Sequence, residues 1–384
     1  MKMTGIVGRI ANSLPPGWES RKTLDRKGKR HWWGSLLARN SLYISIALLV
    51  ICTHFYSLQH GSGDVFLSFE TVMAIMKDTG GALFLALGMG GIMVLGGVDF
   101  SVGRILGLTA WVSAVLLQMP YEEFPPKMFP NLTAPPIILV LLNAVLVGAV
   151  IGVLTGLLVS KLRVHPLLVT LYTQFMIFGL TMGFSQCGMS GGSRIIGGVT
   201  EEYKSAINGT ITIGAAEVPL YVFYAIAAVL IIWYIWNKTT LGKKMYVVGA
   251  NREAARVSGV SIAKTIILVF VVGGILYGFS GFVDAARIKY RNTPSGMHEA
   301  WDFSHVDAIT ACLLGGVSLS GGVGRVRGIV VGVIILSTIT AALVMLGATS
   351  EVLYVVKGAL LIAAAATSAF RSSSDAKHFP GVSS

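Results

Sequence analysis

The chain has few charged residues for its length of 384 residues. Asp, Glu, Lys and Arg make up only 12% of it, whereas hydrophobic residues make up 54%. Because soluble domains carry roughly 25% charged residues, this composition argues against a water-soluble fold. The 46 glycines accompany abundant Leu, Ile and Val rather than polar low-complexity tracts, which excludes a disordered chain.

Cysteine is also scarce. Cys52, Cys187 and Cys312 lie far apart in apolar sequence, without the paired spacing that a disulfide framework or a zinc site requires. We therefore expect all three to be packing residues.

Motifs for catalysis are missing as well. No Gly-x-x-x-x-Gly-Lys-Ser/Thr segment occurs, which excludes an ATPase that uses this phosphate-binding loop. No cluster of His, Glu or Cys with ligand spacing falls inside the apolar runs. We expect neither an enzyme nor a bound metal or cofactor.

Long apolar runs dominate what is present. Because a membrane-spanning helix needs about 20 apolar residues, the sequence predicts an all-α, polytopic membrane protein with about ten transmembrane helices. The eighth run is short, so models with eight or nine spans stay open. The runs lie near residues 40–58, 80–97, 104–119, 137–160, 166–187, 218–236, 263–283, 304–318, 328–347 and 352–370.

The placement of the net charge of +12 predicts the topology. Residues 1–39 contain nine Lys or Arg and two acids, and the loop 237–264 contains six basic residues and one acid. Basic residues favour the cytoplasmic side, so we expect both of these segments in the cytoplasm and 59–79 and 189–217 outside. This topological role is favoured over nucleic-acid binding.

Three regions follow from these patterns. They are a basic cytoplasmic tail (1–39), a transmembrane domain (40–370) that includes the loop 237–264, and a C-terminal tail (371–384) that parity places in the cytoplasm.

An internal repeat marks two glycine-rich junctions. Leu95–Gly107 and Leu314–Gly328 share nine identities when a two-residue gap is opened, and they follow the second and eighth runs. Matching glycine interruptions in two halves of a transporter are typical of broken helices around a permeation pathway. The alternative is a pair of tight cytoplasmic turns in which Gly supplies positive φ.

Two explanations of Asp99, within the first junction, stay open. In the first it acts as the N-cap of the third span, helped by Ser101 and the helix dipole. Alternatively it pairs with Arg104 or Arg325 and holds the two junctions together as a clasp or gate.

Two other ionisable residues lie near span ends. Asp307 follows Ser304 with capping-box-like spacing at the entry of the eighth span. Lys357 lies a turn or two inside the tenth span, and we expect its side chain to reach the external interface.

The cytoplasmic loop contains a short predicted helix. In Asn251-Arg-Glu-Ala-Ala-Arg-Val-Ser-Gly259, Asn251 is a good N-cap, Glu253 faces the positive end of the helix dipole, and Gly259 suits the position after the C-cap. Ala254 and Ala255 would let a partner backbone approach. Such a helix offers a small knob to a cytoplasmic partner.

The same segment resembles the coupling-loop motif of ATP-binding-cassette importer permeases. Three stretches together resemble the ribose and galactose type of monosaccharide permease, and most closely its galactose/methylgalactoside branch: Gly97–Gly103, Trp236–Gly259 and Gly315–Gly322. The resemblance covers nearly all of the chain after about residue 40.

The resemblance implies a homodimeric pore in the bacterial inner membrane, a cytoplasmic ATPase subunit that binds the ATP, and a periplasmic sugar-binding protein. It assigns ATPase coupling to Asn251, Arg252, Glu253, Ala254, Ala255 and Gly259. Candidate pathway or gate positions are Asp99, Ser101, Gly103, Arg104, Gly315, Gly316, Ser318, Gly321, Gly322 and Arg325.

Two alternatives to this function stay open: another class of transporter and another cargo. An ion-coupled secondary transporter would need buried carboxylates or exposed carbonyls for the ion, and Asp99 is the main candidate. Within the same family, ribose, another pentose or a nucleoside would be alternative cargo.

Overall fold

The computed structural model describes residues 50–56, 58, 66, 68–119, 129, 131–162, 164–186, 198–213, 216–287 and 303–378. The predicted basic tail, most of the first predicted span and Cys187 lie outside these residues. The elements are α3 (Phe69–Val94), α4 (Val102–Leu116), α5 (Ile137–Lys161), α6 (Pro166–Gln186), α7 (Glu201–Asn208), β1 (Thr210–Ile213), β2 (Ala216–Pro219), α8 (Leu220–Lys238), α9 (Thr240–Ala250), α10 (Arg252–Val257), α11 (Ile262–Arg287), α13 (Ser304–Leu314), α14 (Val326–Met345) and α15 (Ser350–His378).

Seven of the described helices are long and apolar enough to cross a membrane: α3, α5, α6, α8, α11, α14 and α15. Two predicted spans are shorter. Helix α4 has 15 residues and α13 has 11, so at 1.5 Å per residue α13 is about 16 Å long, roughly half of a bilayer core. The predicted third and eighth spans are therefore short segments next to the glycine junctions.

Helix α3 starts well before the predicted edge at residue 80. Ser68 is its N-cap, and the Ser68 hydroxyl accepts a hydrogen bond of 3.2 Å from the Thr71 amide. A serine cap stabilises the helix start, so the stretch 69–79, predicted as an external loop, is helical.

A small β-hairpin departs from the all-α prediction. β1 and β2 pair antiparallel, with Thr210 opposite Pro219 and Ile213 opposite Ala216. The preceding helix α7 is anchored on α11, because buried Tyr203 donates a hydrogen bond to the Phe282 carbonyl and Asn208 Nδ2 lies 2.7 Å from the Ala286 carbonyl oxygen.

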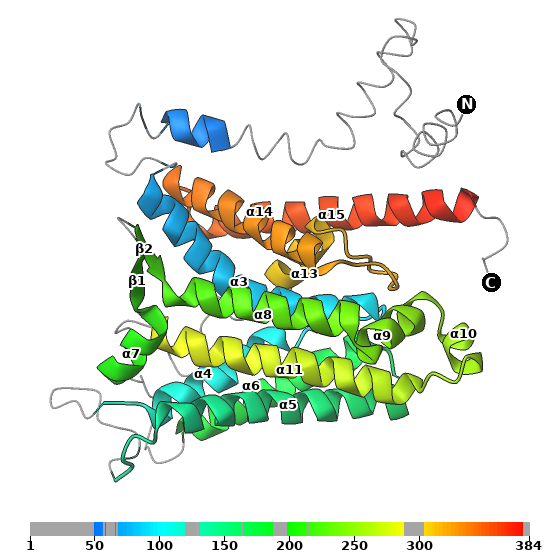
Figure 1. Ribbon diagram of the computed structural model, residues 1–384, viewed down its shortest axis with the longest axis horizontal. Coiled ribbons are helices and arrows are strands. Elements are labelled where there is room, and N and C mark those ends of the chain that lie inside the picture. The colour runs from blue at the N-terminus through cyan, green and yellow to red at the C-terminus, as the bar shows by residue number, and fades with distance from the viewer. Residues whose placement is uncertain are drawn as a thin grey trace, which may run out of the picture.

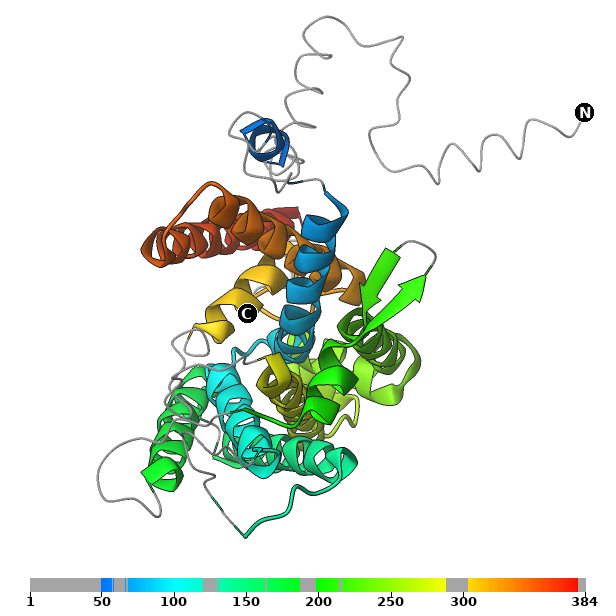
Figure 2. The same ribbon diagram turned by 90° about the vertical axis from the view of Figure 1, so that its left-hand side faces the viewer.

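The long helices lie beside one another, with α7 and the hairpin at one end of the bundle and α9 and α10 at the other (Figure 1). Figure 2 shows α3 between a group containing α14 and α15 and a group containing α4, α5 and α6. Helix α3 is therefore central, and residues 83–94 are buried without a break.

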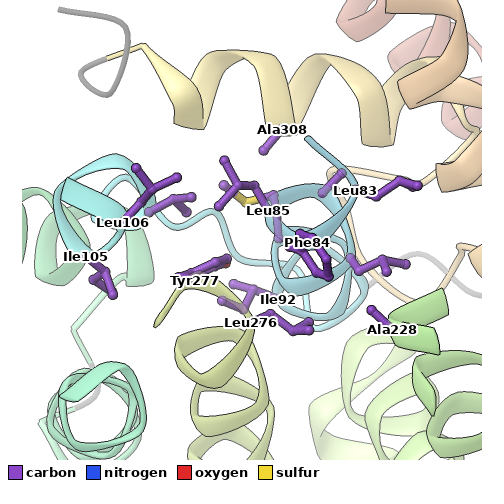
Figure 3. Packing of buried hydrophobic residues seen from close by; sticks show 14 of the residues in the cluster. Leu83, Phe84, Leu85, Ile92, Ile105, Leu106, Ala228, Leu276, Tyr277 and Ala308 are labelled. Atoms are coloured by element: carbon purple, nitrogen blue, oxygen red, sulfur yellow. The ribbon is translucent and has the colours of Figure 1, made fainter. Parts of the chain in front are cut away.

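The core forms around α3. Figure 3 shows Phe84 and Ile92 of α3 among side chains of other helices, including Leu106 of α4, Tyr277 of α11 and Ala308 of α13. The rings of Phe84 and Phe279 have centroids 4.9 Å apart. In a bilayer such tight packing, rather than escape from water, holds helices together.

Small residues bring α5 and α11 into backbone contact. A Cβ atom at Gly148 or Gly152 would clash with the carbonyl oxygens of Gly274 and Phe270, respectively. This spacing of glycines four residues apart is typical of close helix pairs in membranes. The pair α5 and α11 therefore forms a rigid wall beside α3 and α4.

Candidate functional site

Helix α10 has the predicted caps at both ends. Asn251 Oδ1 accepts a hydrogen bond of 2.9 Å from the Ala254 amide. At the other end Gly259 has φ +75°, and the Val260 and Gly259 amides donate to the carbonyls of Ala255 and Arg256, both at 3.0 Å. These two bonds form a Schellman motif. The predicted start and end of this helix are confirmed.

Most of α10 is exposed, at the end of the bundle opposite the hairpin (Figure 1). Glu253 and Arg256 form an ion pair of 2.5 Å on its surface, and Val257 is 82% exposed. Ala255 is 0% exposed and packs into the chain's own core. The expectation that Ala255 faces a partner is therefore wrong, whereas Ala254 is exposed.

Helix α9, which the sequence analysis did not identify, connects α8 to α10. Its Tyr246 hydroxyl donates a hydrogen bond of 2.8 Å to the Gly324 carbonyl, and its ring meets Trp236 edge to face. Burial raises the pKa of Tyr246, and Arg325 opposes that rise. The neutral phenol thus fixes α9 to the second glycine junction.

The two glycine junctions contain the same turn. In the first, Gly96 has φ +77° and the Gly97 amide donates to the Ile92 carbonyl at 3.0 Å; in the second, Gly316 has φ +79° and the Val317 amide donates to the Cys312 carbonyl at 2.9 Å. Both are Schellman ends of helices, α3 and α13. The positive φ falls on the first glycine of one copy and the second glycine of the other, so the structural match is shifted by one residue from the sequence match.

These junctions touch each other and the end of α9. The Gly322 amide donates a hydrogen bond of 2.8 Å to the Val94 carbonyl. A Cβ atom at Gly321 would lie 2.7 Å from the Gly249 carbonyl oxygen and 2.9 Å from the Gly96 nitrogen. Three segments distant in sequence, the two junctions and the end of α9, therefore contact one another through backbone atoms. This contact lies directly before Asn251, the N-cap of α10.

Asp99 bonds locally. Its Oδ1 accepts hydrogen bonds from the Ser101 amide (2.8 Å) and hydroxyl (2.6 Å), and Asp99 is 2% exposed. Ser101, not Asp99, is the N-cap of α4, and its side chain makes no capping bond. Among the described residues no ion pair joins Asp99 to Arg104 or Arg325. The clasp explanation is therefore not the arrangement seen, and Asp99 organises the turn before α4.

The other candidate pathway positions divide between the two junctions. Gly103 is buried in α4, and Arg104 Cζ lies 4.3 Å from the ring centroid of Phe178 in α6. The Ser318 hydroxyl accepts a hydrogen bond from the Ser320 amide. Gly315, Gly316 and Arg325 line a cavity of ≈690 Å³ together with Trp233, Asn237 and Tyr246.

An ion pair between α13 and α15 was missed by the sequence analysis. Lys357 Nζ lies 2.7 Å from Asp307 Oδ2, so the Lys357 side chain is directed at α13, and its reach to the external interface stays a prediction. The N-cap of α13 is Phe303, without a side-chain bond, so Asp307 does not complete a capping box with Ser304. The two partners are 50 residues apart in the sequence. The one sequence feature that pointed to them is that each is an isolated charged residue in an apolar run.

Comparisons with known proteins agree with this arrangement. Residues 72–365 match the family described as branched-chain amino acid transport system / permease component. The chain is 35% identical to the galactose/methyl galactoside import permease protein MglC of Escherichia coli K12, over 86% of this chain and 94% of that protein. It is 34% identical to MglC of Haemophilus influenzae, over 86% and 94%. It is 30% identical to the ribose import permease protein RbsC of Escherichia coli K12, over 88% and 95%.

No solved structure matches the chain. The family match spans α3 to α15 and includes both glycine junctions and α10. With seven apolar helices of membrane-spanning length among its described residues, the chain belongs to the branched-chain amino acid transport system / permease component family and is a multi-pass protein of the inner membrane.

Proposed function

We propose that the chain is the membrane-spanning subunit of an ATP-binding-cassette importer that carries a monosaccharide into the cell. The observation that carries this proposal is α10: a short, doubly capped helix, exposed on nearly all sides, at one end of a bundle of apolar helices. Its exposure supports docking to a cytoplasmic partner, and the resemblance to ATP-binding-cassette importer permeases supports an ATPase subunit as that partner.

The favoured cargo is galactose or a methyl galactoside. The relatives with 34–35% identity are named for these sugars, whereas the ribose-named relative has 30% identity over a similar share of the chain. Ribose is accordingly the second candidate. The remaining partners are a periplasmic sugar-binding protein and a second copy of this chain, as the resemblance to sugar permeases implies.

The topology of the proposal follows from α10. With α10 in the cytoplasm, the hairpin and α7 lie on the periplasmic side, because they occupy the opposite end of the bundle (Figure 1). The last described turn of α15 lies at the same end as α10, which supports a cytoplasmic C-terminus. The basic charge between residues 237 and 264 supports the same orientation.

The contacts described above supply a route for movement. ATP binding and hydrolysis in the partner would displace α10, and α9 carries that displacement to both junctions through Gly249, Gly322 and the Tyr246 hydrogen bond. Because the junctions end α3 and α13, these helices would change position and the pathway would alternate between outward and inward access.

A charge-swap experiment tests the docking role. Glu253→Arg reverses one exposed charge, and the double variant Glu253→Arg/Arg256→Glu keeps the ion pair within α10 while it exchanges the charges shown to a partner. An exposed pair of this kind contributes only about 0.3–0.5 kcal/mol to the helix, so both variants should fold. We expect each to lose co-purification of the ATPase subunit and ATP-driven uptake by at least tenfold.

Glu202→Arg is the matched control, because Glu202 is also exposed but lies in α7 at the other end of the bundle. It should leave uptake unchanged. Recovery of uptake in the double variant would show that only helix stability matters. Unchanged uptake in both α10 variants would remove the docking role of α10.

A further inference from the structure

A cavity lined by seven apolar and six polar residues lies among helices α3, α13, α14 and α15. Its volume is ≈450 Å³, within the range of about 300–1,000 Å³ common for small-molecule sites. The polar residues that line it are Thr71, Asp78, Asp307, Ser337, Thr340 and Lys357.

The cavity lies in the half of the bundle away from α10. Thr71 is near the start of α3, which begins at the hairpin end (Figure 1), and Val344 near the end of α14 lines the same cavity. At the other end of these two helices, Gly90 packs against Ile329, so α3 and α14 are antiparallel. With α10 in the cytoplasm, this cavity occupies the outer half of the membrane domain.

The Asp307–Lys357 ion pair forms part of the cavity wall. The side chains of Lys357 and Asp307 are 21% and 31% exposed, and both line the cavity. The second carboxylate oxygen, Asp307 Oδ1, is buried and receives no hydrogen bond from any residue that the structure describes. Ionisable residues within membrane helices are costly to place there and commonly mark substrate or ion pathways.

The chemistry of this wall matches a neutral polyol. An ammonium group such as that of Lys357 has three donors, and a carboxylate oxygen can accept more than one hydrogen bond. One Lys357 donor is directed at Asp307 Oδ2, so both groups retain capacity for a further hydrogen bond. Neighbouring sugar hydroxyls both donate and accept. The ion pair itself has no net charge and offers a donor and an acceptor side by side. Asp78 also lines the cavity and interacts with another residue.

We propose that this cavity is a sugar-binding station on the permeation pathway, where the Asp307 carboxylate accepts a hydrogen bond from a monosaccharide hydroxyl through Oδ2 and Lys357 Nζ donates one. This inference rests on the proposed function, since it names the substrate contacts of the same importer. The competing explanation is a structural clasp that only ties α13 to α15.

Exchange of the two charges separates these explanations. In liposomes that contain the complete transporter, uptake of radiolabelled D-galactose and of D-ribose is measured for Asp307→Asn, Lys357→Met and the double variant Asp307→Lys/Lys357→Asp. A binding station predicts at least a tenfold loss of uptake in all three, because the exchanged pair moves the acceptor to another helix. Capture of the ATPase subunit and ATP hydrolysis should stay within twofold of wild type.

A clasp predicts instead that the double variant regains wild-type uptake, since it restores the ion pair. That recovery would overturn the proposal, as would wild-type uptake in both single variants.

A second pair of variants does not alter the ion pair. Thr340 and Thr338 each donate a hydrogen bond to the carbonyl four residues earlier in α14. Thr340 lines the cavity that contains the Asp307–Lys357 pair, whereas Thr338 lines an apolar groove on another face. We expect Thr340→Val to raise the sugar concentration for half-maximal uptake at least threefold, and Thr338→Val to leave it unchanged. Equal values for the two variants would contradict the proposal.

The wild-type transporter distinguishes failure of the binding station from failure of the proposed function. If it imports galactose or ribose with ATP and the cavity variants do so equally well, only the binding station is refuted. If it imports neither sugar, the proposed cargo is wrong, and the proposed binding station for that cargo is refuted as well.

Discussion

Single glycine residues determine how closely α9 approaches the two junctions. At Gly249 there is no room for a side chain, because a Cβ atom would overlap the Val94 carbonyl oxygen and lie 2.8 Å from the Gly322 nitrogen. These two groups form the hydrogen bond that joins the first junction to the second. Gly249 therefore permits the contact by which α9 reaches both α3 and the loop after α13.

A methyl group at Gly249 tests this contact. Gly249→Ala has to push two backbones apart, and overpacking of this kind costs about 1–3 kcal/mol. We expect a lower thermal midpoint of the detergent-purified chain and weaker ATP-driven uptake. Gly358→Ala is the control, because no atom lies within 4 Å of a Cβ atom at that helical glycine. Equal midpoints for the two variants would contradict the account of Gly249.

At the level of secondary-structure elements, the sequence predicts best what local interactions determine. The caps of α10 depend on Asn251 and Gly259 within one short segment, so both ends were predicted correctly. The start of α3 was not, because hydrophobicity does not register a cap at Ser68 that lies before the apolar run. Helix α9 was also missed, because it has only 11 residues and contains Gly242 and Gly249, and glycine weakens a helical pattern.

Long-range contacts were beyond the sequence analysis. The Asp307–Lys357 pair and the meeting of Gly96, Gly249 and Gly321 join segments that no local pattern connects. The internal repeat did locate both junctions. The short eighth run anticipated the short helix α13. The length of α4 and the one-glycine shift of the positive φ between the copies were not foreseen, because they depend on where each helix ends in the packed structure.

The N-cap of α10 gives a prediction for this element. Asn251→Ala removes the hydrogen bond to the Ala254 amide, and loss of such a cap costs about 1 kcal/mol of helix stability, which is large for a six-residue helix. We expect sugar-stimulated ATP hydrolysis of the complex to fall severalfold. Asn251→Asp keeps a good cap and should retain most of the activity. Full activity in the alanine variant would mean that α10 does not need its cap to transmit the signal.

At the scale of the whole molecule, the two proposed sites are on opposite halves of one bundle. Helix α10 is exposed at one end, the cavity beside Asp307 and Lys357 lies in the other half, and α3 spans the distance between them (Figure 1). The end of α3 touches α9 through Val94 and Gly249, while Thr71 and Asp78 near its start line the cavity. A movement of α10 thus has a continuous packed connection to the cavity.

The central claim is that ATP hydrolysis in a partner subunit drives sugar import through this chain. The most direct measurement is uptake of radiolabelled galactose and ribose by liposomes that contain the chain with its co-purified partners, with and without ATP, and with and without an imposed proton or sodium gradient. The account predicts uptake that requires ATP and the sugar-binding protein and does not respond to the gradients. Uptake by the chain alone, driven by a gradient without ATP, would contradict it.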